Sequence, residues 1–166
     1  MLTLKIAQPG DLQAVTAIFR RAVDAMDAKG IFQWDDIYPS EAVLRSDIDS
    51  EEMRLVCDGE RVVGAVVLNG RQDEEYALGT WVYGEPAAVV HRLCIDPACQ
   101  QKGYGRQAML LAEEVVAAQG FKSVRLDAFS QNPYALRLYE GLGYRRAGEV
   151  MFRKGLFFLY EKSLTV

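Results

Sequence analysis

The sequence predicts an α/β fold of the mixed α+β kind, with about four helices on the faces of one central mixed, mostly antiparallel sheet of about six or seven strands. Two apolar runs flank Asp58-Gly59, which is a strong hairpin signal. A strand–helix–strand pattern runs from about residue 88 to residue 129, and it implies one parallel crossover. The 166 residues, half of them apolar and a quarter charged, fit one globular domain.

The first elements are justified by alternation, helical spacing and capping residues. Leu2 to Ile6 alternates apolar and polar residues, which predicts a strand. Pro9-Gly10-Asp11 then turns the chain, and Asp11 is a suitable cap for a helix that runs to about Gly30. Ser40 is the expected cap of a second, short helix.

The middle of the chain is predicted to form strands. The hairpin strands are residues 54–57 and 62–68, and Tyr76 to Val82 is interpreted as a third hairpin strand. The long excursion from Asn69 to Glu85 is interpreted as either a lid or a dimer surface. Ala87 to Ile95 is apolar and β-branched, which predicts a buried central strand.

The second half alternates helices and strands. Ser123 to Phe129 is a predicted strand, and two further strand-like runs flank Lys154-Gly155. The predicted helices are Gly103 to Gln119, ended by a glycine, and a short helix opened by Pro133.

Composition excludes several classes of function. The net charge of −4 is unfavourable for a general nucleic-acid binder. A single histidine, His91, excludes a two-histidine metal site within one chain, and no metal is expected. No apolar stretch approaches the ~20 residues of a membrane span and no signal peptide is recognised, so we expect a soluble cytoplasmic protein. Cys57, Cys94 and Cys99 are expected to be buried thiols.

A glycine-rich turn is the most informative stretch. Gly103 and Gly105 stand at the start of a long helix after a buried strand, with Lys102 and Arg106 in the same turn. Helix N-termini offer N–H groups and partial positive charge, so the pattern indicates pyrophosphate binding. The alternative is that both glycines only shape a tight connection.

Two other phosphate-binding motifs fit less well. A Walker A loop is excluded, because no Gly-Lys-Ser/Thr follows the glycines. Gly103-x-Gly105-x-x-Ala108, with Asp127 further on, nearly matches a dinucleotide fingerprint. That fingerprint needs its first glycine directly after the strand, whereas seven residues, Asp96 to Lys102, intervene here. A nicotinamide cofactor therefore stays a weaker alternative.

Two motifs resemble those of the GNAT N-acetyltransferase superfamily. Gln100-x-x-Gly103-x-Gly105, preceded by Leu93-x-Ile95-x-Pro97, is similar to its acyl-CoA signature. Asn132-x-x-Ala135-x-x-Leu138-Tyr139-x-x-Leu142-Gly143-Tyr144 is similar to its second signature, with Tyr144 in place of the more usual Phe. The order of elements resembles this family across essentially the whole chain, which implies a three-layer fold and one acyl-CoA N-acyltransferase domain over residues 1–166.

The resemblance implies acetyl-CoA as co-substrate, without a metal. In the family, the backbone of the strand before the turn pairs with the pantetheine arm, and a main-chain N–H there polarises the thioester carbonyl. Asn132 is expected to hydrogen-bond the cofactor. Tyr139 is expected to contact the cofactor and to act as the general acid that assists thiolate departure. The backbone positions are Leu93, Cys94 and Ile95, and the pyrophosphate cradle is Gln100, Gln101, Lys102, Gly103, Tyr104, Gly105 and Arg106.

His91 is the candidate general base. By strand alternation it shares a face with Leu93 and Ile95, and an imidazole with a pKa of about 6.5 suits proton transfer from an ammonium group. Its alternative is a structural role. The carboxylates Glu75 and Asp127 are fallback bases.

Residues 31–38 resemble the family's acceptor-binding region. Phe32, Trp34 and Tyr38 are candidates for an aromatic wall, while Asp35, with Asp36, is placed to attract a cationic amine. The alternative is that Trp34 packs in the core and both carboxylates are solvated.

The implied function is acetyl transfer from acetyl-CoA to a primary amine by direct attack in a ternary complex, with a small-molecule acceptor. The alternatives are a non-catalytic CoA-binding or sensing domain, or an enzyme that acetylates protein or peptide amines. We expect no nucleic-acid or membrane partner, and a homodimer is possible.

Overall fold

The structure, a computed structural model, describes residues 1–165. Seven strands form one sheet in the order β1-β2-β3-β4-β5-β7-β6, and four α-helices accompany it, which confirms the predicted mixed α/β class. The chain divides into two compact units. Unit 1 comprises Met1–Leu68 and Arg92–Ala112, and unit 2 comprises Asn69–His91 and the chain from Glu113 onward. One domain over residues 1–166 stays a prediction, and its last residue, Val166, lies outside the described residues.

The strands of unit 1 form an antiparallel run that contains the predicted hairpin. Asp58 pairs with Arg61, so Gly59 and Glu60 make a two-residue loop, and Gly59 has a φ of 61° that favours glycine. The elements are β1 (Leu2–Ile6), β2 (Met53–Asp58), β3 (Arg61–Asn69) and the end of β4 (Ala87–Ile95).

Two helices of unit 1 have different N-terminal caps. Ser40 caps α2 (Glu41–Asp49) as predicted, because its hydroxyl accepts the N–H of Val43 at 3.2 Å. Asp11 occupies the N-cap position of α1 (Leu12–Ala28), as predicted, but its side chain makes no capping hydrogen bond. The Asp11 carboxylate accepts the N–H of Gln8 at 2.8 Å instead, which closes the short 3-10 turn η1 (Pro9–Asp11) before the helix.

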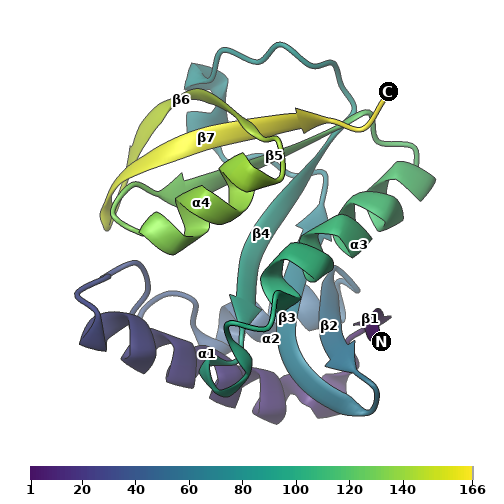
Figure 1. Cartoon of the computed structure of the whole chain (residues 1–166), viewed down its shortest axis with the longest axis vertical. Helices are drawn as coiled ribbons and strands as arrows, with labels where there is room; N and C mark the ends of the chain where they lie inside the picture. The colour runs from purple at the N-terminus through teal and green to yellow at the C-terminus, as the bar shows by residue number, and fades with distance from the viewer. Residues whose placement is uncertain (166) are drawn as a thin grey trace. The chain divides into compact units, whose positions relative to one another are not determined.

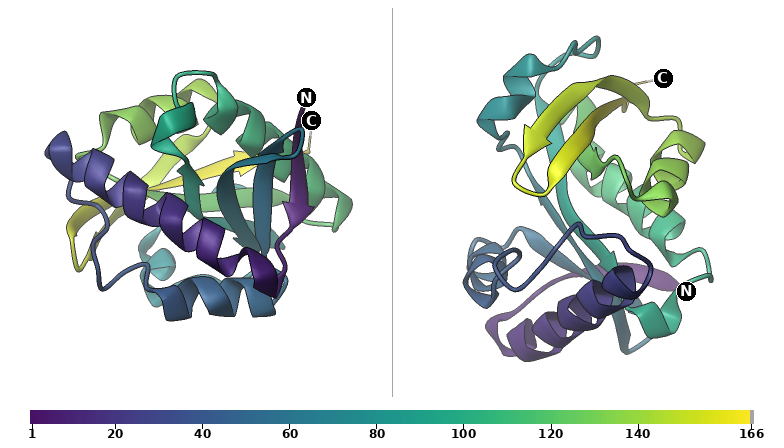
Figure 2. Two further views of the ribbon diagram at one scale, coloured as in Figure 1. Left: turned by 90° about the horizontal axis from the view of Figure 1, so that it is seen from below. Right: turned by 90° about the vertical axis from the view of Figure 1, so that its left-hand side faces the viewer.

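The core of unit 1 lies between these two helices and the strands (Figure 2). Val15, Ile18 and Phe19 come from α1, and Leu44 and Ile48 come from α2. Each fully buried side chain of this size contributes about 1.5–3 kcal/mol through removal of apolar surface from water. Cys94, near the end of β4, belongs to the same core, so this packing holds the end of β4.

Unit 2 contains the parallel pairing and the C-terminal hairpin. β4 pairs in parallel with β5 (Ser123–Phe129) over Ala87 to Val89, as predicted from the strand–helix–strand pattern. β5 then pairs antiparallel with β7 (Gly155–Ser163), which pairs with β6 (Arg145–Phe152). α4 (Pro133–Gly141) packs on β5 (Figure 1). α3 (Tyr104–Ala118) begins in unit 1 and ends in unit 2.

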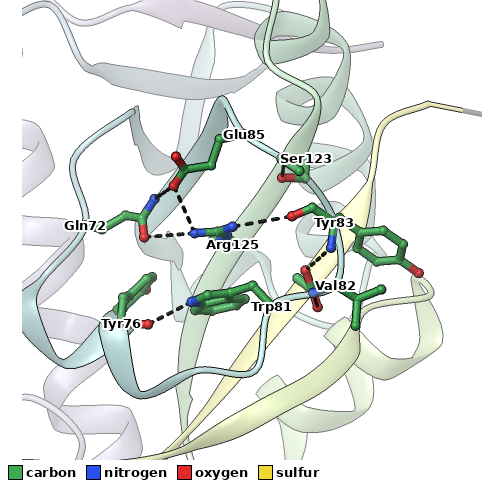
Figure 3. A network of polar contacts seen from close by, with 10 residues as sticks. Gln72, Tyr76, Trp81, Val82, Tyr83, Glu85, Ser123 and Arg125 are labelled. Atoms are coloured by element: carbon green, nitrogen blue, oxygen red, sulfur yellow. Dashed lines mark hydrogen bonds and ion pairs between the residues drawn. The ribbon is translucent and has the colours of Figure 1, made fainter.

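The predicted strand from Tyr76 to Val82 is wrong. Residues 74–78 form a 3-10 helix, η2 (Glu74–Leu78), and an irregular segment follows. The backbone N–H groups of Val82 and Tyr83 donate to the carboxylate of Glu161 on β7, at 2.8 and 3.0 Å. Figure 3 shows this segment against β5 and β7. The Glu161 carboxylate thus accepts the backbone N–H groups that a neighbouring strand would otherwise pair with.

Within residues 1–165, no helix is both long and apolar enough to cross a membrane.

Candidate functional site

The end of β4 carries the three backbone positions predicted to pair with the pantetheine arm. Leu93, Cys94 and Ile95 follow Arg92, which has a φ of 45° in the middle of the strand. A non-glycine residue in this left-handed region interrupts regular alternation. The expectation that His91 shares a face with Leu93 and Ile95 therefore loses its basis, because that rule holds only for a regular strand.

The predicted phosphate turn begins at Asp96 and leads into α3. Gln101 and Gly103 both adopt left-handed conformations, with φ of 68° and 75°. Left-handed residues in a turn direct successive N–H groups toward one concave side, which is a common arrangement for anion binding. Lys102 lies between them, and Arg106 stands in the first turn of α3, which begins at Tyr104. Backbone and charge in this segment thus fit a pyrophosphate.

Two polar contacts brace this turn from other parts of unit 1. Arg21 on α1 donates to Asp96 at 2.8 Å, and Asp96 also accepts the N–H of Ala98. The hydrogen bond from Arg21 lowers the pKa of Asp96. The Tyr104 hydroxyl donates to Asp58, at the end of β2. The turn is therefore tied to a helix and to a hairpin before any ligand binds.

Asn132 and Tyr139 belong to α4 in unit 2. The side-chain oxygen of Asn132 accepts the N–H of Ala135 at 3.1 Å, so Asn132 caps this helix. Tyr139 is buried and its ring contacts the rings of Tyr144 and Tyr160. Burial, with a smaller contribution from the charge of Asp127, raises the pKa of Tyr139, so its hydroxyl keeps its proton at neutral pH.

His91 has a defined tautomer. Its Nε2 lies 2.9 Å from Asn69 Oδ1, and the same Oδ1 accepts the backbone N–H of Arg71 at 2.9 Å. A backbone N–H requires an acceptor, so this atom is the amide oxygen and His91 Nε2 must donate to it. When His91 is neutral, the basic nitrogen is consequently Nδ1. No sequence pattern indicated the role of Asn69.

The fallback bases lie in unit 2. Asp127 accepts the hydroxyl hydrogen of Tyr76 at 2.7 Å, and Tyr76 is almost fully buried. Burial, followed by the charge of Asp127, raises the pKa of Tyr76, so this pair is a carboxylate and a protonated phenol. Glu75 is half-buried in η2. Within residues 1–165, no group of three or more His, Cys, Asp or Glu side chains is arranged to hold a metal ion.

The predicted acceptor segment divides into exposed and buried residues. Phe32 and Tyr38 are 55% and 39% exposed, but Trp34 is only 9% exposed and packs on Phe19, with ring centroids 5.3 Å apart. Trp34 is thus a core residue, in agreement with the alternative interpretation, and its role in acceptor binding stays a prediction. Asp35 accepts the N–H groups of Ile37 and Tyr38. Its carboxylate therefore shapes the turn that presents Tyr38.

Asp36, the second carboxylate of this segment, is almost fully exposed. It lies 3.4 Å from Arg20 on α1, an exposed pair that contributes little to stability.

Two charged residues of unit 1 were not recognised in the sequence. Arg92 donates to both carboxylate oxygens of Asp47 on α2, at 2.9 and 2.6 Å, and donates to the Tyr38 hydroxyl at 2.6 Å. The available signal was Arg92 itself, a charge within a run predicted to be a buried strand. Such a residue is rarely buried without a partner.

Comparison with known proteins agrees with this geometry. The family model described as "Acetyltransferase (GNAT) family" matches residues 17–144. The mycothiol acetyltransferase of Streptosporangium roseum is 39% identical over 71 residues, which are 42% of this chain and 21% of that protein. The matched part of the first three such relatives is 21% to 25% of their length, so the chain corresponds to a fraction of each.

Solved structures share the fold. A GNAT-family acetyltransferase from Streptococcus agalactiae superposes with a TM-score of 0.86, at 17% identity, over 98% of this chain and 95% of that one. The PaiA N-acetyltransferase of Thermoplasma acidophilum, in complex with coenzyme A, superposes with a TM-score of 0.74 at 17% identity, over 98% and 99% of the two chains. Because the family model spans most of the chain and the fold agrees, this chain belongs to the acetyltransferase (GNAT) family.

Proposed function

We propose that this protein is an acetyl-CoA-dependent N-acetyltransferase that moves an acetyl group to a primary amine of a small molecule by direct attack in a ternary complex. The observation that carries the proposal is the segment from Asp96 to Arg106. It combines two left-handed residues, two basic side chains and the start of a 15-residue helix in a chain of this family. The names of related proteins, such as mycothiol acetyltransferase, agree with acetyl transfer.

Unit 1 would bind the co-substrate. Bound acetyl-CoA supplies an activated acetyl thioester with a thiol leaving group. The N–H groups of the turn from Gln100 to Arg106 would hold its phosphates, and Lys102 and Arg106 would offset their charge. The peptide groups of Leu93, Cys94 and Ile95 would pair with its amide-bearing arm, and one N–H there would polarise the acetyl carbonyl.

Unit 2 would supply the groups that transfer protons. Tyr139 keeps its hydroxyl hydrogen at neutral pH because burial raises its pKa, so the phenol can donate toward the departing sulfur. His91 would accept a proton from the ammonium form of the acceptor through Nδ1, since Nε2 donates to Asn69. Asn132 would reach the cofactor from the first turn of α4 while its side-chain oxygen caps that helix.

The proposal is tested by mixing the chain with acetyl-CoA and a panel of amines, and measuring thiol release and acetylated product by mass spectrometry. The panel holds small amines, amino sugars, amino acids and a peptide with an N-terminal amine. We expect amine-dependent release of one thiol per acetylated small molecule. Acetyl-CoA binding without turnover of any amine would favour a sensing domain, and acetylation of the peptide alone would favour a protein or peptide acceptor.

The role of Tyr139 has a matched control. Tyr139→Phe should lower kcat about 100-fold, because general acid catalysis contributes roughly 10²–10⁴-fold. Tyr144→Phe removes a hydroxyl from the neighbouring ring, which donates to Glu113, and should leave kcat within about threefold of the wild type. An unchanged kcat in Tyr139→Phe would exclude the general-acid role.

A further inference from the structure

Arg92 is a buried cation at an irregular point of a central strand. Its side chain is 11% exposed. Its backbone φ of 45° lies in the left-handed region, which non-glycine residues rarely adopt. Non-glycine residues persist there only when surrounding contacts hold them, and such residues are concentrated at functional sites. In sequence, Arg92 lies between the candidate base His91 and the first predicted cofactor-binding residue, Leu93.

The guanidinium of Arg92 joins two other segments of unit 1. Its Nε and Nη2 donate to the two oxygens of Asp47 on α2, at 2.9 and 2.6 Å, and that carboxylate is itself 5% exposed. Its Nη1 donates to the hydroxyl of Tyr38 at 2.6 Å, and its central carbon lies 5.8 Å from the Tyr38 ring centroid. The planar fork of arginine makes such a divided contact possible, whereas lysine offers only a point charge.

The third contact is the informative one. The Asp47 carboxylate alone compensates the charge of Arg92. The guanidinium nevertheless also donates to Tyr38, which is 39% exposed and belongs to the predicted acceptor segment. The backbone of Tyr38 is fixed as well, because its N–H donates to the Asp35 carboxylate and its carbonyl accepts the N–H of Asp35 at 3.0 Å. The hydroxyl and the backbone of Tyr38 are therefore both fixed, although the ring is partly exposed and adds little to the core. Such an arrangement pre-organises the side chain for binding.

We propose that Arg92 is a positioning residue for the acceptor, and that Tyr38, oriented by Arg92, is a determinant of acceptor affinity. This inference rests on the proposed function. Asp47 anchors the guanidinium, and Arg92 directs the phenol ring and hydroxyl of Tyr38 so that the acceptor meets one fixed surface. Loss of the link would raise the KM for the amine while leaving the KM for acetyl-CoA unchanged.

The test compares two conservative variants with a matched control. Tyr38→Phe removes one hydroxyl from a partly exposed ring, and Arg92→Lys keeps the charge but removes the fork. Glu41→Ala alters a carboxylate in the first turn of α2 that is 57% exposed and lies outside the predicted acceptor segment. We expect the KM for the amine to rise about five- to tenfold in the first two variants, as the loss of one hydrogen bond would produce. The KM for acetyl-CoA should stay within twofold, and Glu41→Ala should match the wild type.

Equal increases in both KM values, or no change in the KM for the amine in Tyr38→Phe, would overturn the inference. Hydrogen exchange without substrate provides a readout independent of catalysis. Peptides covering residues 31–39 should exchange faster in Tyr38→Phe and Arg92→Lys than in Glu41→Ala, and equal exchange rates would also overturn it. A wild-type chain that binds acetyl-CoA but acetylates no amine would refute the proposed function, and exchange alone would then decide whether Arg92 fixes Tyr38.

Discussion

Two irregular segments of this protein are held in different ways. The turn from Asp96 to Gly103, in unit 1, is tied by the contact of Arg21 with Asp96 and by the contact of Tyr104 with Asp58. The Asp96 carboxylate is buried, but the Arg21 side chain is half exposed, and so is that of Asp58. The excursion from Asn69 to Glu85, in unit 2, is tied instead by Glu161, which is fully buried. Glu161 accepts two backbone N–H groups of the excursion and pairs with Arg145.

Arg125 on β5 adds a second buried anchor to the excursion. Its guanidinium lies 4.4 Å from the ring centroid of Trp81 and donates to Gln72 and to the carbonyl of Tyr83 (Figure 3). The indole N–H of Trp81 in turn donates to the carbonyl of Tyr76 at 2.7 Å.

The difference concerns what each segment is able to do. Buried charged partners fix a segment strongly, because a bond broken there leaves a charge without solvent or partner. Partly exposed partners fix a segment weakly, and water replaces them at low cost. We therefore expect the excursion to behave as a fixed part of unit 2, and the turn to adjust when a ligand binds.

The largest effect is expected from the buried anchor. Glu161→Ala leaves Arg145 and two backbone N–H groups without their acceptor, and should lower the free energy of unfolding by about 3–5 kcal/mol. Urea denaturation measures this. Glu149→Ala, an exposed glutamate on β6, is the control and should change stability by less than about 0.5 kcal/mol. Equal losses in the two variants would show that the excursion is not held by Glu161.

A smaller effect is expected at the turn. Asp96→Asn removes a charge-assisted contact and should lower the free energy of unfolding by about 1–2 kcal/mol at pH 7. Because the hydrogen bond from Arg21 lowers the pKa of Asp96, its contribution is present above the unfolded value of about 3.9 and is lost as pH falls through the folded value.

The difference in stability between wild type and Asp96→Asn should therefore shrink as pH falls below about 4, as followed by urea denaturation at several pH values. A difference that is independent of pH in this range would contradict the assigned role of Arg21.

The smallest effect concerns Asn69, where the excursion joins β3. Asn69→Asp keeps an acceptor for His91 Nε2 but adds a negative charge, which favours the imidazolium form and should raise the pKa of His91. The acid limb of the pH profile of kcat/KM should then move upward by on the order of one pH unit. His91→Ala should abolish this limb, and adding Asn69→Asp in that background should not restore it. An unmoved limb in the single variant would argue against His91 as the base.

Local signals in the sequence predicted most of the fold. The Asp58-Gly59 hairpin, the Ser40 cap and the strand from Ala87 to Ile95 depend on neighbouring residues, and the structure confirms them. The glycine-rich turn was recognised because its glycines and basic residues lie close together in the sequence.

The errors have a common physical cause. Tyr76 to Val82 has a β-like composition, but its backbone partner is a carboxylate 78–79 residues further along the chain, which no local pattern reveals. Asp11 is an exception with a local cause: it stands at the N-cap position, but its carboxylate accepts the N–H of Gln8, three residues earlier. Trp34 fits either an aromatic wall or the core in sequence, and its contact with Phe19 places it in the core. The link of Arg92 to Asp47 and Tyr38 was missed for the same reason, since it joins residues 45 and 54 positions apart.

Hydrogen exchange with and without acetyl-CoA tests the central claim, that the segment from Leu93 to Arg106 binds the co-substrate. Without ligand, the amides of Val82 and Tyr83 should already exchange slowly, because Glu161 accepts both, while peptides over residues 96–106 should exchange faster. Acetyl-CoA should slow exchange over residues 93–106 and leave Val82 and Tyr83 unchanged. No protection of residues 93–106 by acetyl-CoA, or protection of this segment by NADH instead, would contradict the account.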